Sequence, residues 1–223
     1  MNLEELNKEY DKLQEKYGAK ELSAIYNGGC LKHPDFCFVF MNPTGKNPAS
    51  SKTWEGIRAP WLGTKNSWDL FFSLNLLSED IYKEIKIRKG QEWDVKFAKR
   101  VYEDVEKHKV FITNLGKCTQ IDARPLPDSV YKKYLKLLFR EIEIVAPKII
   151  LLFGNQVSSL ILEEKIAVSK VRRKEFIKEI NKKKYTFYSV FYPVGNGRFN
   201  LNKAIEDIQW IIESKSQNEK RTI

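Results

Sequence analysis

The sequence contains few residues that could ligate a metal ion or build a disulfide framework. Its 223 residues include three cysteines and two histidines. Cys30, Cys37 and Cys118 are odd in number and too sparse for the disulfide framework of a small secreted protein. A zinc site formed by these cysteines with His33 is an alternative, although their spacing is irregular for zinc ligands. We therefore expect buried free thiols in a reducing compartment, with no metal ion and no cofactor.

Long apolar runs are also missing. The amino-terminal segment MNLEELNKEYDKLQEKYG is charged throughout and lacks the apolar centre of a signal peptide. No later stretch approaches the roughly 18 apolar residues that a membrane-spanning helix needs. These absences predict a cytoplasmic protein that does not enter a membrane.

Two glycine motifs lack the residues that would make them nucleotide-binding loops. Gly45-Lys46 has no upstream glycine and precedes Asn47 instead of Ser or Thr, so it is not a phosphate-binding P-loop. The Gly-Asn-Gly segment at 195–197 lacks the third glycine of a dinucleotide-binding fingerprint. The sequence therefore gives no support to a nucleoside triphosphate or nicotinamide site.

Positive charge, in contrast, is abundant. Lys and Arg total 39 against 29 acidic residues, which gives a formal net charge of +10, and the isoelectric point is about 9.3. This balance favours a nucleic acid as the partner, although excess lysine can also serve solubility alone. The stretch 165–184 holds nine basic residues against two acidic ones. It could follow a phosphate backbone or form a solvated helix and turn.

The length and the 42 % hydrophobic content predict one globular domain over residues 1–223. Within it we expect an amino-terminal helix in residues 1–20 and a flexible tail at 213–223. Runs of apolar and β-branched residues predict four strands, at 36–41, 109–114, 148–153 and 185–191. Helical periodicity predicts the segments between them and after the last one, at 67–77, 92–108, 127–145, 155–162 and 201–212.

This alternation predicts an α/β fold, a three-layer α/β/α sandwich with a short, mostly parallel four-stranded central sheet. Ligands of such sheets bind beyond the carboxyl ends of the strands. The four strand exits should therefore converge on one crevice. They are Asn42-Pro43, Asn114-Leu115, Gly154-Asn155 and Tyr192-Pro193.

Three of these exits carry sequence blocks that resemble, in order, those of the uracil-DNA glycosylase superfamily. FVFMNPTG at 38–45 is similar to the Asn-Pro-Gly turn of its mismatch-specific and single-strand-selective branches. FITNLGKC at 111–118 is similar to a segment of the thermophilic branch, and GIRAPWLG at 56–63 resembles the element that precedes the first long helix. YPVGNGR at 192–198 resembles the loop that in most members begins His-Pro-Ser. The likeness spans residues 36 to about 200.

The resemblance implies catalytic roles for Asn42 and Tyr192. Asn42 would position a water molecule near the sugar C1′, and Tyr192, which stands where most members have histidine, could donate a hydrogen bond through its hydroxyl. Trp61 and Pro43 would line the pocket for an extruded base, and the amide of Asn114 would pair with the edge of that base. Core packing of Trp61 and Tyr192, and a capping or turn role for Asn114, are the structural alternatives.

The resemblance also implies contacts with DNA. The expected DNA-binding residues are the loop after the fourth strand, with Asn196 or Arg198 as a wedge into the duplex, and Lys117 in the second block. The loop residues are Val194, Gly195, Asn196, Gly197 and Arg198. An ordinary glycine turn before the last helix is the alternative.

The activity implied is monofunctional hydrolysis of the N-glycosidic bond of uracil, or of a related deaminated base, by base flipping in DNA during base excision repair. The thermophilic branch holds an iron–sulfur cluster on four cysteines, and the Cys-x-x-Cys pairs for it are missing here. We expect a monomer. A nucleic-acid-binding member of the same fold with weak or no catalysis is the first alternative, and an α/β enzyme acting on a free nucleotide is the second.

Overall fold

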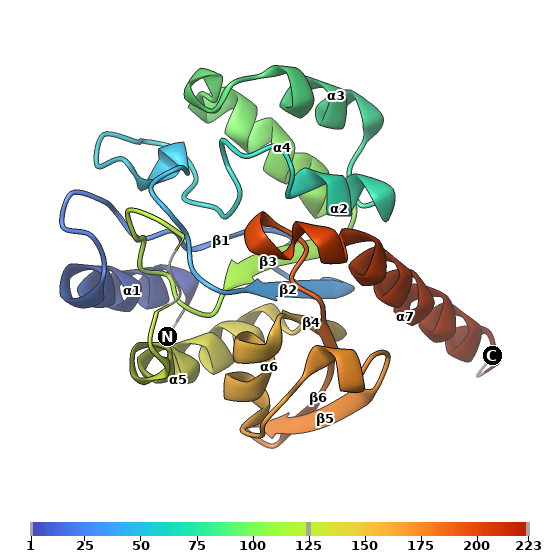
Figure 1. Ribbon diagram of the computed structural model, residues 1–223. Helices are drawn as coiled ribbons and strands as arrows, with labels where there is room; N and C mark the ends of the chain where they lie inside the picture. Colours follow the sequence, from blue (N-terminus) through green and yellow to red (C-terminus); the bar gives the residue numbers. More distant parts are fainter. Residues whose placement is uncertain (1, 124–125, 222–223) are drawn as a thin grey trace.

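The computed structural model describes residues 2–123 and 126–221, with side chains up to residue 215. Within these residues, one six-stranded sheet has the order β1-β3-β2-β4-β6-β5 (Figure 1). Its strands are β1 (Asn27–Gly29), β2 (Phe36–Phe40), β3 (Val110–Asn114), β4 (Ile149–Phe153), β5 (Glu175–Ile180) and β6 (Lys183–Val190).

The sheet is mixed, so the prediction of a four-stranded, mostly parallel sheet is wrong. The strands β3, β2, β4 and β6 pair in parallel and correspond to the four predicted strands. On either side of them, β1 pairs with β3 and β5 pairs with β6 in the antiparallel sense. The sequence of β1 is Asn-Gly-Gly, which has low strand propensity, and β5 lies inside the lysine-rich stretch that we interpreted as a charge run.

The β5–β6 hairpin accounts for the second half of the stretch 165–184. Asn181 and Lys182 connect the two strands, and both have positive φ, 48° and 69°. Two positive φ values in a two-residue connection are typical of a type I′ hairpin turn, whose twist matches that of the strands.

Helices cover both faces of the sheet (Figure 1). One apolar cluster joins one sheet face to α1, α5 and α6, and a second joins the other face to α2, α3, α4 and α7. Alternate residues of each central strand enter the two clusters, for example Phe38 and Val39 of β2. The helices are α1 (Leu3–Tyr17), α2 (Trp68–Ser73), α3 (Glu79–Ile87), α4 (Val95–Lys107), α5 (Asp128–Val145), α6 (Asn155–Leu162) and α7 (Leu201–Arg221).

The two ends of the chain are helical in the described residues. Asn2 caps α1 with a reciprocal capping box, in which its side chain accepts from the Glu5 N–H and the Glu5 carboxylate accepts from the Asn2 N–H. The last helix, α7, continues to Arg221, through most of the segment expected as a tail. Residues 222–223 of that tail lie outside the described residues. Among the described helices, none is long and apolar enough to cross a membrane.

Candidate active site at the strand exits

The exits of β2 and β3 lie side by side. Phe40 of β2 is in register with Asn114 of β3. Beyond the strands, the Leu115 N–H donates to the Phe40 carbonyl at 2.7 Å and the Gly116 N–H donates to the Met41 carbonyl at 2.8 Å. These bonds continue the pairing of the two segments beyond the strands, as far as Asn42. The structure therefore brings the first two sequence blocks together.

The side chain of Phe40 is the centre of this region. Its ring is 4.8 Å from the Trp61 ring and 6.3 Å from the Tyr192 ring, both in edge-to-face arrangements. Phe40 itself is 1 % exposed and stacks on Phe153 of β4 at 4.2 Å. Trp61, Asn114 and Tyr192, which are far apart in the sequence, therefore all neighbour Phe40.

The amide of Asn42 is held by a residue that sequence reasoning missed. The Tyr131 hydroxyl, from α5, donates to Asn42 Oδ1 at 2.6 Å, while Asn42 Nδ2 donates to the Pro43 carbonyl at 3.2 Å. Tyr131 is fully buried, and its burial raises the pKa of the hydroxyl, which keeps it a neutral donor. Asn42 is itself half-buried, and the adjacent Pro43 is buried.

The amide of Asn114 has an unpaired donor. The residue is 3 % exposed, and its Nδ2 is buried with no hydrogen-bond partner among the described residues. A buried donor without a partner costs about 1–3 kcal/mol, so a ligand oxygen that reaches it would relieve that cost. Because Nδ2 is covered by protein in this structure, a base can reach it only after neighbouring side chains move.

Trp61 lies at the end of the loop between β2 and α2. Its backbone φ is +64°, and its carbonyl accepts hydrogen bonds from the Thr64 hydroxyl and from Trp68 Nε1. Its own Nε1 is buried without a partner among the described residues. The Trp61 ring is partly buried against the core next to Phe40. It is thus packed against the core and also adjacent to the strand exits.

Tyr192 follows β6, and its ring packs against Phe40 in the same region. Burial raises the pKa of its hydroxyl to about 12, so the group stays protonated in ordinary buffers. A Cβ added to Gly197 would lie 2.1 Å from the Tyr192 carbonyl oxygen, so the loop can approach Tyr192 this closely only with glycine at that position.

The loop after Tyr192 forms η4 (Gly195–Asn200), a 3-10 helix that leads into α7. Val194 is 8 % exposed and belongs to the interior, whereas Asn196 and Arg198 are exposed. Sequence reasoning missed Phe199, whose side chain is 95 % exposed at the end of this loop. A large aromatic residue just after a Gly-x-Gly segment was the signal that could have identified it.

The structure contradicts the prediction that Lys117 contacts DNA. Its side chain is 0 % exposed, and its Nζ pairs with Glu141 Oε2 at 2.9 Å. The exit of β3 turns this side chain inward, under the sheet, where α5 supplies the carboxylate. Lys117 therefore offers no charge to a phosphate at the surface.

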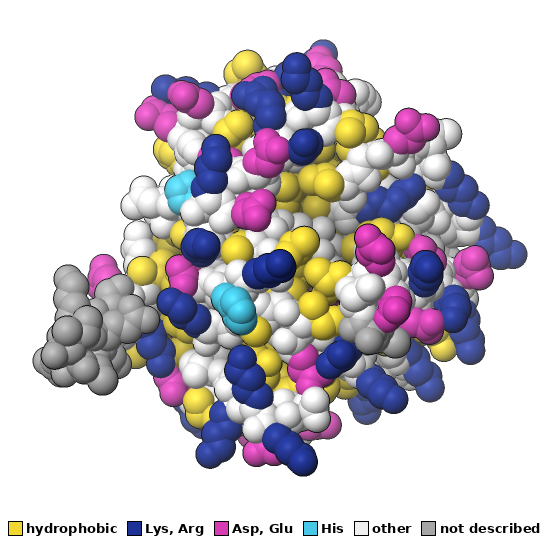
Figure 2. All heavy atoms as spheres, turned by 180° about the vertical axis from the view of Figure 1, so that it is seen from behind, with side chains coloured by type: hydrophobic (Ala, Val, Ile, Leu, Met, Phe, Trp, Pro, Cys, Tyr) yellow, Lys and Arg dark blue, Asp and Glu magenta, His cyan; other side chains and the backbone are white. Residues whose placement is uncertain are grey.

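Several residues of the basic stretch at 165–184 form ion pairs with acidic side chains of the protein itself. Arg172 and Arg173 both donate to Asp207 of α7, whose side chain is 0 % exposed. Lys178 pairs with Glu163. Figure 2 shows basic side chains spread among acidic ones over the rear face instead of forming one continuous basic patch.

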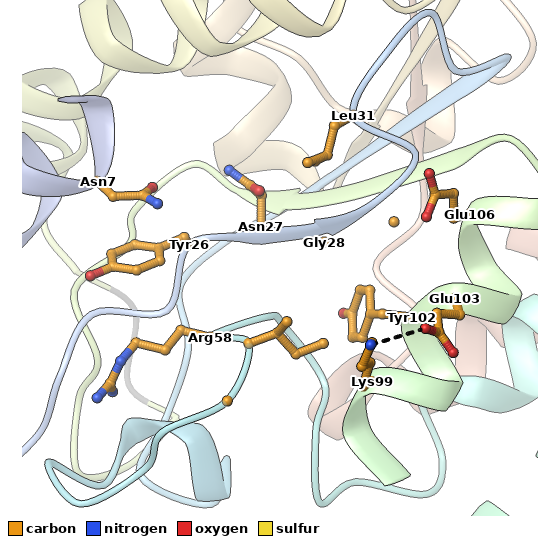
Figure 3. Close-up of a pocket in the computed structure, with 13 residues that line it drawn as sticks. Asn7, Tyr26, Asn27, Gly28, Leu31, Arg58, Lys99, Tyr102, Glu103 and Glu106 are labelled. Carbon is orange, nitrogen blue, oxygen red and sulfur yellow. Dashed lines mark ion pairs between the residues drawn. The ribbon is translucent and has the colours of Figure 1, made fainter. Parts of the chain in front are cut away.

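A separate cavity lies at the β1 edge of the sheet. Its volume is about 460 Å³, and its lining comes from α1, β1, the loop at 56–58 and α4. Figure 3 shows Tyr26 and Arg58 on one side and the Lys99–Glu103 ion pair on the other. Lys99 Nζ lies 3.6 Å from Glu103 Oε1. None of the predicted site residues lines it, so this cavity is distinct from the strand exits.

All three cysteines are buried free thiols.

The arrangement defines the class of protein. It is an α/β protein in which Asn114, Trp61 and Tyr192 neighbour Phe40 at the carboxyl ends of parallel strands, with the Asn42 amide at the exit of β2. The family model described as "Uracil DNA glycosylase superfamily" matches residues 42–210, which is more than half of the chain. The chain belongs to this superfamily, whose members are in general glycosylases that act on DNA.

Proposed function

We propose that this protein is a monofunctional DNA glycosylase that hydrolyses the N-glycosidic bond of uracil, or of a related deaminated base, in base excision repair. The observation that supports this most is the meeting of Asn114, Trp61 and Tyr192 around Phe40, in a chain of the uracil-DNA glycosylase superfamily. Amides and aromatic rings are the groups that hold an unstacked base by its edge and its face.

In double-stranded DNA, the base must leave the double helix before it can react. In the proposal, the η4 loop approaches the duplex and its exposed side chains take the place of the extruded base, with Phe199 joining Arg198 and Asn196 as candidate wedges. Trp61 and Pro43 then line the pocket. The Asn114 Nδ2 donor, unpaired in the described residues, gains a base oxygen as its partner.

Asn42 and Tyr192 act on the reacting atoms. Tyr131 uses one lone pair of Asn42 Oδ1, which leaves the other for a water molecule. That water adds its oxygen to C1′ as the C1′–N bond breaks; the bonding electrons leave with the base, and the water proton passes to solvent or to the base. The neutral Tyr192 hydroxyl donates to the departing base and stabilises its negative charge.

The first test measures base release from oligonucleotides. Single- and double-stranded DNA containing uracil, hypoxanthine or xanthine is incubated with the protein and then cleaved with alkali at abasic sites. Cleavage at uracil is the expected result, and no cleavage of any of the substrates contradicts the proposal. The same experiment without added metal tests the expectation that hydrolysis needs no cofactor.

A non-catalytic nucleic-acid-binding role is the second candidate. It is favoured by two observations, the covered Nδ2 of Asn114 and the tyrosine at a position where most members have histidine. It predicts salt-sensitive binding of DNA without base release, because phosphate contacts weaken as salt rises. In either role we propose a monomer that acts in the reducing cytoplasm, where its three thiols stay free.

A further inference from the structure

Beneath the strand exits lies a group of charged and polar side chains, the charge network, which is fully buried except for its half-buried asparagine. It consists of Asn27, Thr113, Lys117 and Glu141, from β1, β3, the β3 exit and α5. The side chains of both Lys117 and Glu141 are 0 % exposed, and their Nζ and Oε2 atoms lie 2.9 Å apart. Nothing in the proposed chemistry uses this pair directly.

The network leaves its charges well paired. Lys117 Nζ donates to Thr113 Oγ1, to the Asn114 carbonyl at 2.7 Å and to Glu141 Oε2. Glu141 Oε2 also accepts from the Thr113 hydroxyl at 2.7 Å, and Oε1 accepts from Asn27 Nδ2 at 2.7 Å. All three donors of the ammonium group are therefore used, and both carboxylate oxygens have partners.

A buried ion pair of this kind is weak evidence for stability. Removing two charges from water costs much of what their attraction returns, and apolar residues of similar volume often replace such a pair without loss of stability. Consistent with this cost, burial lowers the pKa of the Lys117 ammonium, and the neighbouring Glu141 opposes that shift. A role in orienting another group gives a reason for the pair that stability alone does not.

The group within reach is Asn114. Lys117 binds its main-chain carbonyl, and Thr113, which precedes it, is bound by both charged residues. The Asn114 side chain cannot be fixed through Nδ2, which has no partner among the described residues. The direction of its amide therefore depends on the backbone that carries it.

We propose that the Lys117–Glu141 pair is a positioning device that fixes the end of β3 and so aims the Asn114 amide at the bound base. This proposal rests on the proposed function. Lys117 and Glu141 are positioning residues, because both are fully buried and act through Asn114. The other end of the network is Asn27, which lines the separate cavity at the β1 edge (Figure 3).

The test removes both charges and keeps the volume. In the double variant Lys117→Met/Glu141→Leu, no charge is left buried alone, so the melting temperature should fall less than in either single variant. Release of uracil should nevertheless fall about 10- to 100-fold, the range typical of residues that orient a functional group. The loss should appear in the single-turnover rate constant and in the preference for uracil over other bases, since the orientation of the Asn114 amide has changed.

A second charge pair, which is partly exposed, provides the control. Lys86 and Asp69 lie 2.8 Å apart between α3 and α2, on the other face of the sheet. The variant Lys86→Met/Asp69→Leu should leave base release and base preference within about twofold of the parent protein. An equal loss in both double variants would overturn the proposal, because it would report a general effect of removing ion pairs.

A readout without activity separates this proposal from the proposed function. The side-chain amide resonance of Asn114 is assigned in a ¹⁵N-labelled protein by its disappearance in Asn114→Ala. In Lys117→Met/Glu141→Leu that resonance should shift or broaden, and in the control it should not. If the parent protein releases no base, the proposed function fails while this measurement still decides the positioning. A native melting temperature, native activity and an unmoved resonance in the double variant would overturn it.

Discussion

The strand-exit region has an outer layer, formed by Asn114 and Trp61, and an inner layer, the charge network. The two layers differ in whether their buried polar groups have hydrogen-bond partners. In the outer layer, Asn114 Nδ2 and Trp61 Nε1 are buried without partners among the described residues. In the charge network just beneath, the three donors of Lys117 and both oxygens of Glu141 are paired. Unpaired buried donors cost stability, and sites that bind a polar ligand are where that cost is expected. Under the proposed function, the unpaired donors are the groups that a ligand would reach, and the paired ones hold them in place.

The largest expected effect is at Asn42. Replacing Asn42 with Ala should lower single-turnover base release by at least about 100-fold, because the group proposed to position the attacking water is lost. The half-buried side chain makes two hydrogen bonds at the surface of the core, so the circular dichroism spectrum should stay that of the parent. Release at the parent rate would move the catalytic role to another residue.

Asn114 and Thr113 are adjacent residues whose replacement should have opposite effects, the first on base release and the second on stability. Asn114→Ala should reduce base release about 10- to 100-fold with little change in the free energy of unfolding, since its Nδ2 has no described partner to lose. Thr113→Val removes a hydroxyl that binds both Lys117 and Glu141, and should lower the free energy of unfolding by about 1–3 kcal/mol. Urea unfolding and single-turnover kinetics on both variants make the measurement. Equal destabilisation by the two would remove the distinction between the layers.

Phe199 tests the outer surface. Because its side chain is 95 % exposed, Phe199→Ala should change the free energy of unfolding by less than about 0.5 kcal/mol. Its kcat/KM on duplex DNA should fall about tenfold and on single-stranded DNA much less, because only a duplex base must be unstacked. Ile87→Ala, at an apolar residue that is 78 % exposed at the end of α3, is the control. Equal losses on both substrates would argue against a wedge.

The pH dependence of release tests Tyr192. Burial raises its pKa to about 12, so the hydroxyl remains a protonated donor below that pH and is lost only as the pH rises through it. The rate should therefore show no loss from Tyr192 between about pH 7 and 10, whereas an unperturbed histidine donor would lose its charge near 6.5. Tyr192→Phe should lower kcat about tenfold at all of these pH values. A parent-like rate in Tyr192→Phe would assign the residue to packing alone.

The smallest expected effect is at Tyr131. Tyr131→Phe keeps the ring in the core and removes the hydroxyl that donates to Asn42 Oδ1. A neutral hydrogen bond contributes about 0.5–1.5 kcal/mol, so kcat should fall about 3- to 10-fold with KM unchanged. A rise in KM without a change in kcat would show that Tyr131 supports binding and not the orientation of Asn42.

The sequence predicted the central strands because their signals are local. FCFVF and IILLF are continuous apolar runs bounded by turn residues, and they form β2 and β4. The two edge strands depend on pairing: Asn27–Gly29 is a strand only because β3 lies beside it, and Glu175–Ile180 only because the hairpin folds it back onto β6. Tertiary contacts of this kind leave little trace in local propensity.

The same limit applies to the site. The strand exits could be predicted, since parallel strands end at one edge of the sheet. The inward turn of Lys117 could not, because its partner Glu141 lies 24 residues away on a helix. Tyr131 was missed for the same reason, as it is one of several apolar or aromatic residues on the buried side of α5. The direction in which a side chain points is decided by such distant partners.

Trp61 keeps its bulky ring on a backbone that favours glycine. A left-handed φ of +64° costs an L-residue with a large side chain about 1–2 kcal/mol, and glycine would adopt it freely. The packing of the indole against Phe40 and the core offsets this cost, so Trp61→Gly would relax the main chain but lose the buried ring. The strained backbone thus holds the indole in one fixed place beside the strand exits.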